Sequence, residues 1–235
     1  MNMTESLIVL QARYASRRLR GKALASLGGR SILIHCLDRL TIGDAAPLVL
    51  ATTTTTDDDA LATAAVEHGV PVVRGPNDDV LHRFVMAATR FGTRFVVRAT
   101  ADNPAVDIDG PRRVLNALRM TGADYVVEVG LPYGASVEAF TVDALERAAT
   151  IASSASDREH VTSLIRRHPR FRAIEIPAPV ALRRPELRLT VDTPADLAYM
   201  RLVVVPLYET TREPSLKAII EAADALDHHA LAVAS

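Results

Sequence analysis

The chain has 235 residues, of which 49% are hydrophobic and 23% charged, and its formal net charge is −1. This length and composition suit one sizeable hydrophobic core, and the near-neutral charge argues against a general nucleic-acid binder. The single cysteine, Cys36, excludes a disulfide within the chain and argues against a structural zinc site.

Short apolar runs alternate with helical patterns through the first half of the chain. Strands are predicted at residues 7–10, 47–51, 70–73, 95–99 and 124–129. Helices are predicted at 31–40, 58–68, 77–91 and 111–121, with Asn77 as the N-cap of the third. This alternation is typical of right-handed βαβ units. We therefore predict an α/β fold with a Rossmann-like, mostly parallel sheet.

The second half of the chain is less regular. Ser156 and Glu159 have the Ser-x-x-Glu spacing of a capping box, which predicts a helix that begins there and ends near His168. Thr193 followed by Pro194 predicts another capped helix. The remaining predicted elements are a strand at 136–140, a helix at 142–151, extended pieces near 172–176 and 187–191, and a last helix at 215–226.

The organisation of the chain predicts one domain over residues 1–235. We find no internal repeat and no Pro/Gly/Ser-rich linker. The first apolar run is four residues long, and no run approaches the about 20 apolar residues that cross a bilayer. We therefore expect a cytoplasmic protein that has neither a secretory signal nor a membrane partner.

Five cations follow the first predicted strand, namely Arg13, Arg17, Arg18, Arg20 and Lys22. In open α/β sheets, ligands bind beyond the carboxyl ends of the strands, so this loop is a candidate site. The cluster could be a solvated surface, a nucleic-acid patch or a cradle for a polyphosphate. It is neither a Walker A loop nor a dinucleotide fingerprint, because the glycine spacing of both is missing. We favour the polyphosphate cradle.

Polar side chains at the other strand ends complete the candidate site. Carboxylates near cations suit a magnesium ion that holds phosphates. The residues found at these strand ends are Gln11, Ala12, Thr52, Thr53, Arg74, Arg98, Thr100 and Asp102.

The stretch QARYASRRLRGKAL (11–24) resembles the opening signature of the SpsF-like cytidylyltransferases, relatives of CMP-KDO and CMP-sialic acid synthetases. The resemblance continues in order through six further blocks and covers nearly the whole chain. It implies the nucleotide-diphospho-sugar transferase fold, CTP as donor, Mg²⁺, release of pyrophosphate and a homodimer. The blocks are VVRGPNDDVLHRF (72–84), VVRATADNPAVD (96–107), ADYVV (123–127), SVEAF (136–140), REHVT (158–162) and LRLTVDTPADL (187–197).

The resemblance also implies roles for individual residues. Arg13, Arg18 and Lys22 would hold the triphosphate, and Asp102 and Asp192 would bind magnesium. The groups around the nucleotide would be Leu10, Gln11, Ala12, Thr52, Thr53, Arg74, Arg98 and Thr100. Those facing a small anionic acceptor would be Tyr133, Glu138, Glu159 and His160, and the segment 131–184 would cover the acceptor and a partner subunit.

Several of these residues have a simpler structural interpretation. Asp102 precedes Asn-Pro and suits a turn, and Asp192 precedes a capped helix. Glu159 occupies the third position of the predicted capping box, and its neighbour His160 suits a packed or solvent-facing histidine. Cys36 lies on the apolar face of a predicted helix and is assigned to the core.

Two departures from the family signature concern the acceptor. Arg17 stands where a small hydroxyl residue is usual, and Arg20 replaces a proline. We predict that at least one of them meets an anionic group on the acceptor, against the alternative that both face solvent. Ser136 replaces an aspartate, which makes a common sugar acid less secure as the acceptor. The acceptor is expected to be a sugar acid, a phosphonate or a phosphorylated small acid. The competing functions are a nucleotidyltransferase that uses another NTP and a non-catalytic nucleotide-binding module.

Overall fold

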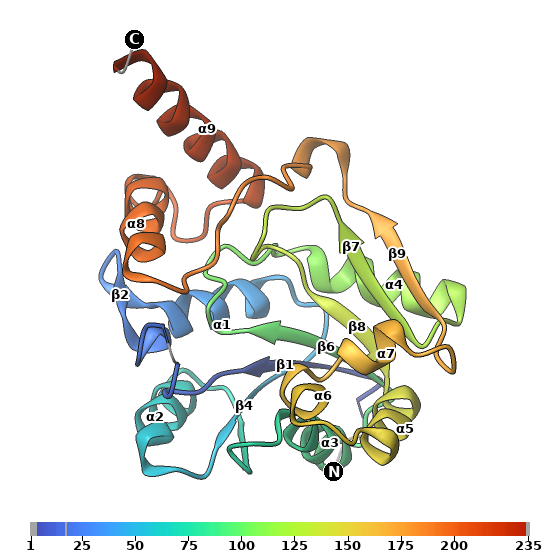
Figure 1. The fold of residues 1–235 in the computed structure, drawn as a ribbon. Coiled ribbons are helices and arrows are strands. Elements are labelled where there is room, and N and C mark those ends of the chain that lie inside the picture. The colour runs from blue at the N-terminus through green and yellow to red at the C-terminus, as the bar shows by residue number, and fades with distance from the viewer. Residues whose placement is uncertain (1–3, 17, 234–235) are drawn as a thin grey trace.

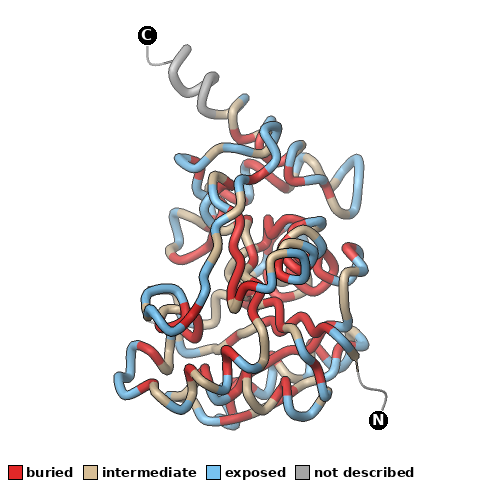
Figure 2. The backbone as a smooth tube through the Cα atoms, turned by 90° about the vertical axis from the view of Figure 1, so that its right-hand side faces the viewer, coloured by how far each residue is buried: buried red, intermediate tan, exposed pale blue. Residues whose placement is uncertain are grey.

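The strand Ser6–Gln11 (β1) lies inside a seven-stranded sheet, with a strand paired on each side, in the computed structural model, which describes residues 4–16 and 18–233. Ile8 and Leu10 point into one hydrophobic core, and Leu7 and Val9 point into another. A parallel strand covered on both faces buries both sets of alternating side chains, so its sequence is a continuous apolar run. Figure 2 shows the buried segments gathered along the middle of the molecule.

The sheet has the order β5-β4-β1-β6-β8-β7-β9. β8 is antiparallel to both of its neighbours, and the other pairings are parallel, which confirms the predicted mostly parallel sheet. The pairing of Gln11 with Thr100 brings the carboxyl ends of β1 and β6 together. The strands are β4 (Leu48–Thr53), β5 (Val72–Gly75), β6 (Phe95–Thr100), β7 (Tyr125–Val129), β8 (Glu138–Thr141) and β9 (Ala173–Pro177).

Helices cover both faces of the sheet (Figure 1). One core contains side chains of α1 (Ile32–Ile42), α2 (Asp59–Glu67), α4 (Gly110–Thr121), α8 (Pro194–Tyr208) and α9 (Leu216–Val233). The other contains side chains of α3 (Val80–Phe91), α5 (Val142–Ile151) and α7 (Ser163–Arg167). None of the described helices combines the length and apolar character that crossing a membrane requires.

Shorter elements connect this framework. The loop after β1 leads into the 3₁₀ helix Lys22–Leu24 (η1) and a small hairpin, Ser26–Leu27 (β2) with Arg30–Ser31 (β3). The others are Thr56–Asp58 (η2), Ala155–His160 (α6) and Val180–Leu182 (η3). Figure 1 shows α9 projecting from the body towards the C-terminus.

The structure corrects two predicted helix starts. Asp79 rather than Asn77 caps α3, and its Oδ1 accepts from the backbone N–H of His82 at 2.8 Å. The predicted helix from Ser156 to His168 is two helices, α6 and α7, and Ser154 is the N-cap of α6. Serine, asparagine and aspartate are all good caps, so spacing alone could not choose between neighbouring candidates.

The predicted extended piece at 187–191 runs beside the loop after β7. Tyr133 and Arg188 form an isolated bridge, with N–H groups of Tyr133 and Leu189 donating to carbonyls across it. Gly134 has φ +97°, and a Cβ there would lie 2.8 Å from both Cβ and the backbone nitrogen of Thr190. Glycine therefore permits the close approach of two segments that line the site described below.

We expect Gly134→Ala to lower the free energy of unfolding by about 3 kcal/mol, because the new methyl group meets backbone atoms that cannot move aside. Urea unfolding measures the loss. Gly122→Ala is the matched control, since Gly122 also has a positive φ (+61°) but has nothing within 4 Å of the added Cβ. This control measures only the cost of placing a residue with a Cβ at a positive φ, about 1 kcal/mol. Equal losses in the two variants would contradict the proposed clash.

Candidate active site

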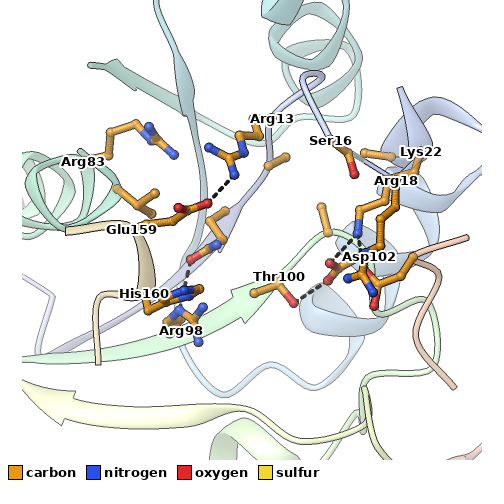
Figure 3. Close-up of a pocket in the computed structure, with 16 residues that line it drawn as sticks. Arg13, Ser16, Arg18, Lys22, Arg83, Arg98, Thr100, Asp102, Glu159 and His160 are labelled. Carbon is orange, nitrogen blue, oxygen red and sulfur yellow. Dashed lines mark hydrogen bonds and ion pairs between the residues drawn. The ribbon is translucent and has the colours of Figure 1, made fainter. Parts of the chain in front are cut away.

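Two adjoining cavities open at the carboxyl ends of β1 and β6. Cavity A, of about 450 Å³, lies among the loop after β1, α3 and α6, and Figure 3 shows its lining. Cavity B, of about 810 Å³, lies among β6, the loop after β7, α7 and the segment before α8. The residues common to both linings, hereafter the shared wall, are Gln11, Arg18, Arg98, Thr100, Asp102, His160 and Asp192.

Lys22 joins two carboxylates at the shared wall. Its ammonium donates to Asp102 Oδ2 at 2.7 Å and to Asp192 Oδ1 at 2.8 Å (Figure 3). Arg18 pairs with the same oxygen of Asp192 at 2.8 Å, and Arg188 binds its other oxygen at 2.5 Å. Burial raises the pKa of Asp192, but Lys22 and the two arginines outweigh that effect and hold it below its usual value. Asp192 is therefore ionised at neutral pH.

Local backbone structure places these groups. Gly21, at φ +68°, turns the chain into η1 at Lys22, and a Cβ there would lie 2.7 Å from the Tyr14 ring. On the opposite side, the Val191 N–H donates to the Asp102 carbonyl at 2.8 Å. The capping box of α8 then secures Asp192, whose own N–H donates to Asp196 at 2.9 Å. Asp102 and Asp192, 90 positions apart in the chain, thus meet at one end of the sheet.

Asp58 anchors the loop after β1. Its Oδ1 accepts from the Tyr14 N–H at 2.7 Å, and its Oδ2 accepts from the Thr52 hydroxyl and from the N–H and hydroxyl of Thr53. Burial raises the pKa of Asp58, but these hydrogen bonds outweigh it, so the pKa lies below its usual value. The loop that holds the cations is therefore tied to the end of β4 by a buried carboxylate.

A largely buried ion pair between Arg98 and Glu138 lies in the lining of cavity B, next to Gln11. Arg98 donates to Gln11 Oε1 at 3.0 Å and to Glu138 Oε2 at 2.5 Å. Tyr125 and Thr162 donate their hydroxyl groups to Glu138 at 2.6 and 3.0 Å. Burial raises the pKa of Glu138, but the charge of Arg98 and these donors hold it below its usual value. This pair fixes the side chain of Arg98 at the shared wall.

A strained turn carries His160 to the shared wall. Val161 has φ 53° and ψ −64°, and the Thr162 N–H donates to the His160 carbonyl at 2.5 Å, which is a γ-turn of the rare positive-φ kind. A β-branched residue in this conformation is an outlier, and such outliers gather at functional sites. The turn separates α6 from α7 and thereby brings His160 and Thr162 into the lining of cavity B.

Glu159 is not a capping residue, which corrects one of the sequence interpretations. The capping carboxylate of α6 is Asp157, whose N–H and carboxylate both bind the Ser154 hydroxyl. Glu159 instead pairs with Arg13 across cavity A (Figure 3). The N-cap, Ser154, lies two residues before the predicted cap Ser156, so Glu159 falls outside the capping position and lies at the cavity.

Several predicted site residues line neither cavity. Leu10 is fully buried in the core, and Thr52 and Thr53 are fully buried against Asp58. Arg74 binds the carbonyls of Thr53 and Thr55 and pairs with Asp59. The polar groups of Thr52, Thr53 and Arg74 are thus occupied by neighbouring residues.

The acceptor residues predicted from the sequence are divided in the structure. Tyr133 and Glu138 line cavity B, Glu159 lines cavity A, and His160 lines both. Arg20 lines neither; it pairs with Asp57 at 2.8 Å and lies over the Tyr14 ring. Arg17 lies outside the described residues.

Sequence reasoning assigned no role to several polar residues that line the cavities, among them Ser16 and Arg83 in cavity A and Thr162 and Arg166 in cavity B. Arg83 is 1% exposed, and burial lowers its pKa. Its guanidinium donates to the Pro76 carbonyl at 2.5 Å, while its Nε finds no hydrogen-bond partner within the described part of the chain. The sequence held one sign of this residue: Arg83 follows Val80 by three positions and so lies on the apolar face of the predicted helix. Thr162 and Arg166 left no such signal.

The shared wall suits a divalent cation bound together with phosphates. The described residues include no cluster of three or more His, Cys, Asp or Glu that could hold a metal by itself. Asp102 and Asp192 nevertheless contact one ammonium nitrogen from two sides, so both carboxylates can face one small cation. Mg²⁺ is commonly held by one or two carboxylates plus substrate phosphates, which is the donor set available here.

Comparison with known proteins shows to which protein family the chain is similar. A protein-family model described as cytidylyltransferase matches residues 7–222. The spore coat polysaccharide biosynthesis protein SpsF of Bacillus subtilis is 33% identical over 201 residues, which cover 83% of this chain and 84% of SpsF. A 3-deoxy-manno-octulosonate cytidylyltransferase of Yersinia enterocolitica is 28% identical over 141 residues, 59% of this chain and 55% of that enzyme.

A solved structure agrees over nearly the whole length. A cytidylyltransferase of Leptospira borgpetersenii superposes with a TM-score of 0.88 at 26% identity, and the match covers 97% of this chain and 96% of that one. The expected nucleotide-diphospho-sugar transferase fold and the family resemblance are therefore confirmed.

The Asp58 anchor predicts a pH-dependent loss of stability in Asp58→Asn. We expect the free energy of unfolding at pH 7 to fall by about 2–3 kcal/mol, because hydrogen bonds to a buried carboxylate are lost. Because the pKa of Asp58 is lower in the folded protein than in the unfolded chain, its ionised form stabilises the fold at pH values above the unfolded pKa near 4. This stabilisation is lost as the pH falls below that value. The difference from wild type should therefore shrink below pH 4. Urea unfolding at pH 7, 5 and 3.5 measures it.

Asp57→Asn is the control for this prediction. Asp57 is half exposed and pairs with Arg20 at the surface, so its loss should cost less than about 1 kcal/mol at every pH. An Asp58→Asn deficit that stayed constant from pH 7 to 3.5 would refute the anchor as an ionised carboxylate.

Proposed function

Because the chain belongs to the cytidylyltransferase family, we propose that it transfers CMP from CTP to a small anionic acceptor and releases pyrophosphate. The observation that carries this proposal is the shared wall. Two cavities large enough for two small molecules meet at one surface that contains two carboxylates and several cations. CTP in cavity A and an acceptor in cavity B would meet at that surface.

The cations of cavity A suit a triphosphate. Arg13, Arg18 and Lys22 come from one loop, and Arg83 faces them from α3. Arg13 and Lys22 are held by carboxylates that the ligand would replace or share, so they are already oriented. Preorganised positive charge stabilises the negative charge that grows on the leaving pyrophosphate, and this accounts for much of the rate enhancement in phosphoryl-group transfer.

In the proposed reaction, an acceptor oxygen attacks the α-phosphorus in line with the bond to the departing pyrophosphate. Lys22 and Arg18 neutralise the departing group, and the proton of the acceptor passes to a basic group of the shared wall, where the candidates are His160 and the carboxylates. Asp102 and Asp192 would hold Mg²⁺, which supplies charge neutralisation and lowers the pKa of a bound oxygen. Arg98, fixed by Glu138, orients the reactants at the wall.

A substrate panel tests the proposed function directly. Pyrophosphate release is measured with CTP, UTP, ATP or GTP in turn, each with Mg²⁺ or with EDTA. Each mixture also contains 3-deoxy-manno-octulosonate, 2-hydroxyethylphosphonate or glycerol 3-phosphate. We expect turnover with CTP, Mg²⁺ and at least one acid. Preference for another NTP would place the chain with a different nucleotidyltransferase activity, and tight CTP binding without turnover on any acceptor would favour a binding module.

The positions of Asp192 and Lys22 predict a large loss of activity when either charge is removed. We expect Asp192→Asn and Lys22→Met each to reduce kcat/KM for CTP by about 100-fold or more, since each removes charge at the reacting phosphate. Asp192→Asn should also weaken Mn²⁺ binding in the presence of CTP, which electron paramagnetic resonance measures. Asp143→Asn is the control, because Asp143 is exposed and, among the described residues, forms its ion pair with Arg147 on the same helix, α5. Unchanged Mn²⁺ affinity in Asp192→Asn would exclude it as a metal ligand.

A further inference from the structure

Arg166 is the cation in the lining of cavity B that no carboxylate neutralises at hydrogen-bond distance. Among the described residues, its guanidinium donates no hydrogen bond, and the one carboxylate oxygen within 4 Å is Glu138 Oε1 at 3.9 Å. Its side chain is 53% exposed. The other two arginines of the lining, Arg18 and Arg98, have short ion pairs of 2.8 and 2.5 Å.

The carboxylates of cavity B are already matched by other cations. Glu138 accepts from Arg98, Tyr125 and Thr162, so its two oxygens have short partners. The remaining pairs are Asp102 with Lys22, Asp192 with Lys22 and Arg188, and Glu128 with Arg113 at 2.6 and 2.8 Å. Arg166 therefore contributes positive charge to the cavity that is available to a ligand.

The position of Arg166 separates its ligand from the nucleotide. Arg166 lines cavity B and an outer groove beside β9, but it does not line cavity A. It is nevertheless one carboxylate away from the shared wall, because Glu138 lies between it and Arg98. A small hydroxy acid in cavity B could therefore contact the wall with its hydroxyl oxygen and Arg166 with its charged group. Its charged group is distinct from the oxygen that faces the nucleotide.

The backbone holds Arg166 in this position. Its N–H donates to the Thr162 carbonyl at 2.9 Å, and its neighbours Leu164 and Ile165 are buried in the core under α7. The γ-turn at Val161 begins this segment. The guanidinium therefore extends from a fixed Cα, which reduces the freedom that binding an anion would cost.

We propose that Arg166 binds an oxyanion of the acceptor, a carboxylate, phosphonate or phosphate group that is separate from the attacking oxygen, and so determines acceptor specificity. The proposal rests on the proposed function, since it names the class of molecule in cavity B. A planar guanidinium binds such groups through two parallel hydrogen bonds, and a partly desolvated cavity strengthens the attraction. Arg98 is already paired, which leaves Arg166 to provide this contact.

Binding of simple anions tests Arg166 without requiring turnover. Methylphosphonate, inorganic phosphate and acetate are titrated separately into the full chain saturated with CTP and Mg²⁺, and calorimetry measures each affinity. We expect Arg166→Gln to lower the affinity for the preferred anion at least fivefold and Arg166→Lys to retain part of it. Arg170→Gln, which removes an exposed charge four positions along the same segment, should change it less than twofold. The preferred anion distinguishes a carboxylate from a phosphorus acid.

Kinetics provide a second measurement on any acceptor that turns over. Arg166→Gln should raise the acceptor KM at least tenfold while the CTP KM stays within twofold. The uncharged ester of the acceptor, a methyl ester for a carboxylate or a dimethyl ester for a phosphorus acid, should lose this sensitivity. Equal anion affinity in wild type and Arg166→Gln, or an equal loss in Arg170→Gln, would overturn the proposal. A wild-type protein that releases no pyrophosphate refutes the proposed function instead, and the calorimetry still decides whether Arg166 binds an anion.

Discussion

The contact of the Lys22 ammonium with Asp102 and Asp192 is the interaction on which the geometry of the site depends. It joins three segments that are 80 and 90 residues apart along the chain: the loop after β1, the end of β6 and the approach to α8. Each segment is also secured by its own backbone contacts, at Gly21, at the Asp102 carbonyl and at the capping box of α8. Because the three charges are oriented before any ligand arrives, little reorganisation remains for binding.

Two carboxylates that are shielded from solvent hold cationic parts of the site in place, one at the loop after β1 and one at β6. Asp58 accepts four hydrogen bonds and ties Tyr14 to the end of β4, while Glu138 fixes Arg98. A buried carboxylate is costly unless its oxygens are satisfied, and both of these are satisfied by several donors. The chain thereby concentrates positive charge towards the cavities although its formal net charge is only −1.

The division of labour between the two cavities follows from the γ-turn at Val161. A continuous helix through residues 156–168 could not direct both Glu159 towards Arg13 and Thr162 towards Glu138, since the turn reverses the chain between them. The strained backbone at a buried valine is the local cost of this arrangement. Cavity A and cavity B are consequently lined by residues from the two sides of this turn.

Local sequence determined much of the fold and the cationic loop. The apolar run of β1, the alternation of strands and helices, and the cluster from Arg13 to Lys22 depend on residues close together in the chain, where propensity and periodicity act. The resemblance across collinear blocks placed the chain in its family. Only the tertiary structure decided which charges meet: it brought Arg166 and Arg83 into the cavities and left Arg20 with Asp57 and Arg74 with Asp59. These pairings join residues distant in the chain, so they depend on how the sheet and its helices pack, which no local pattern encodes.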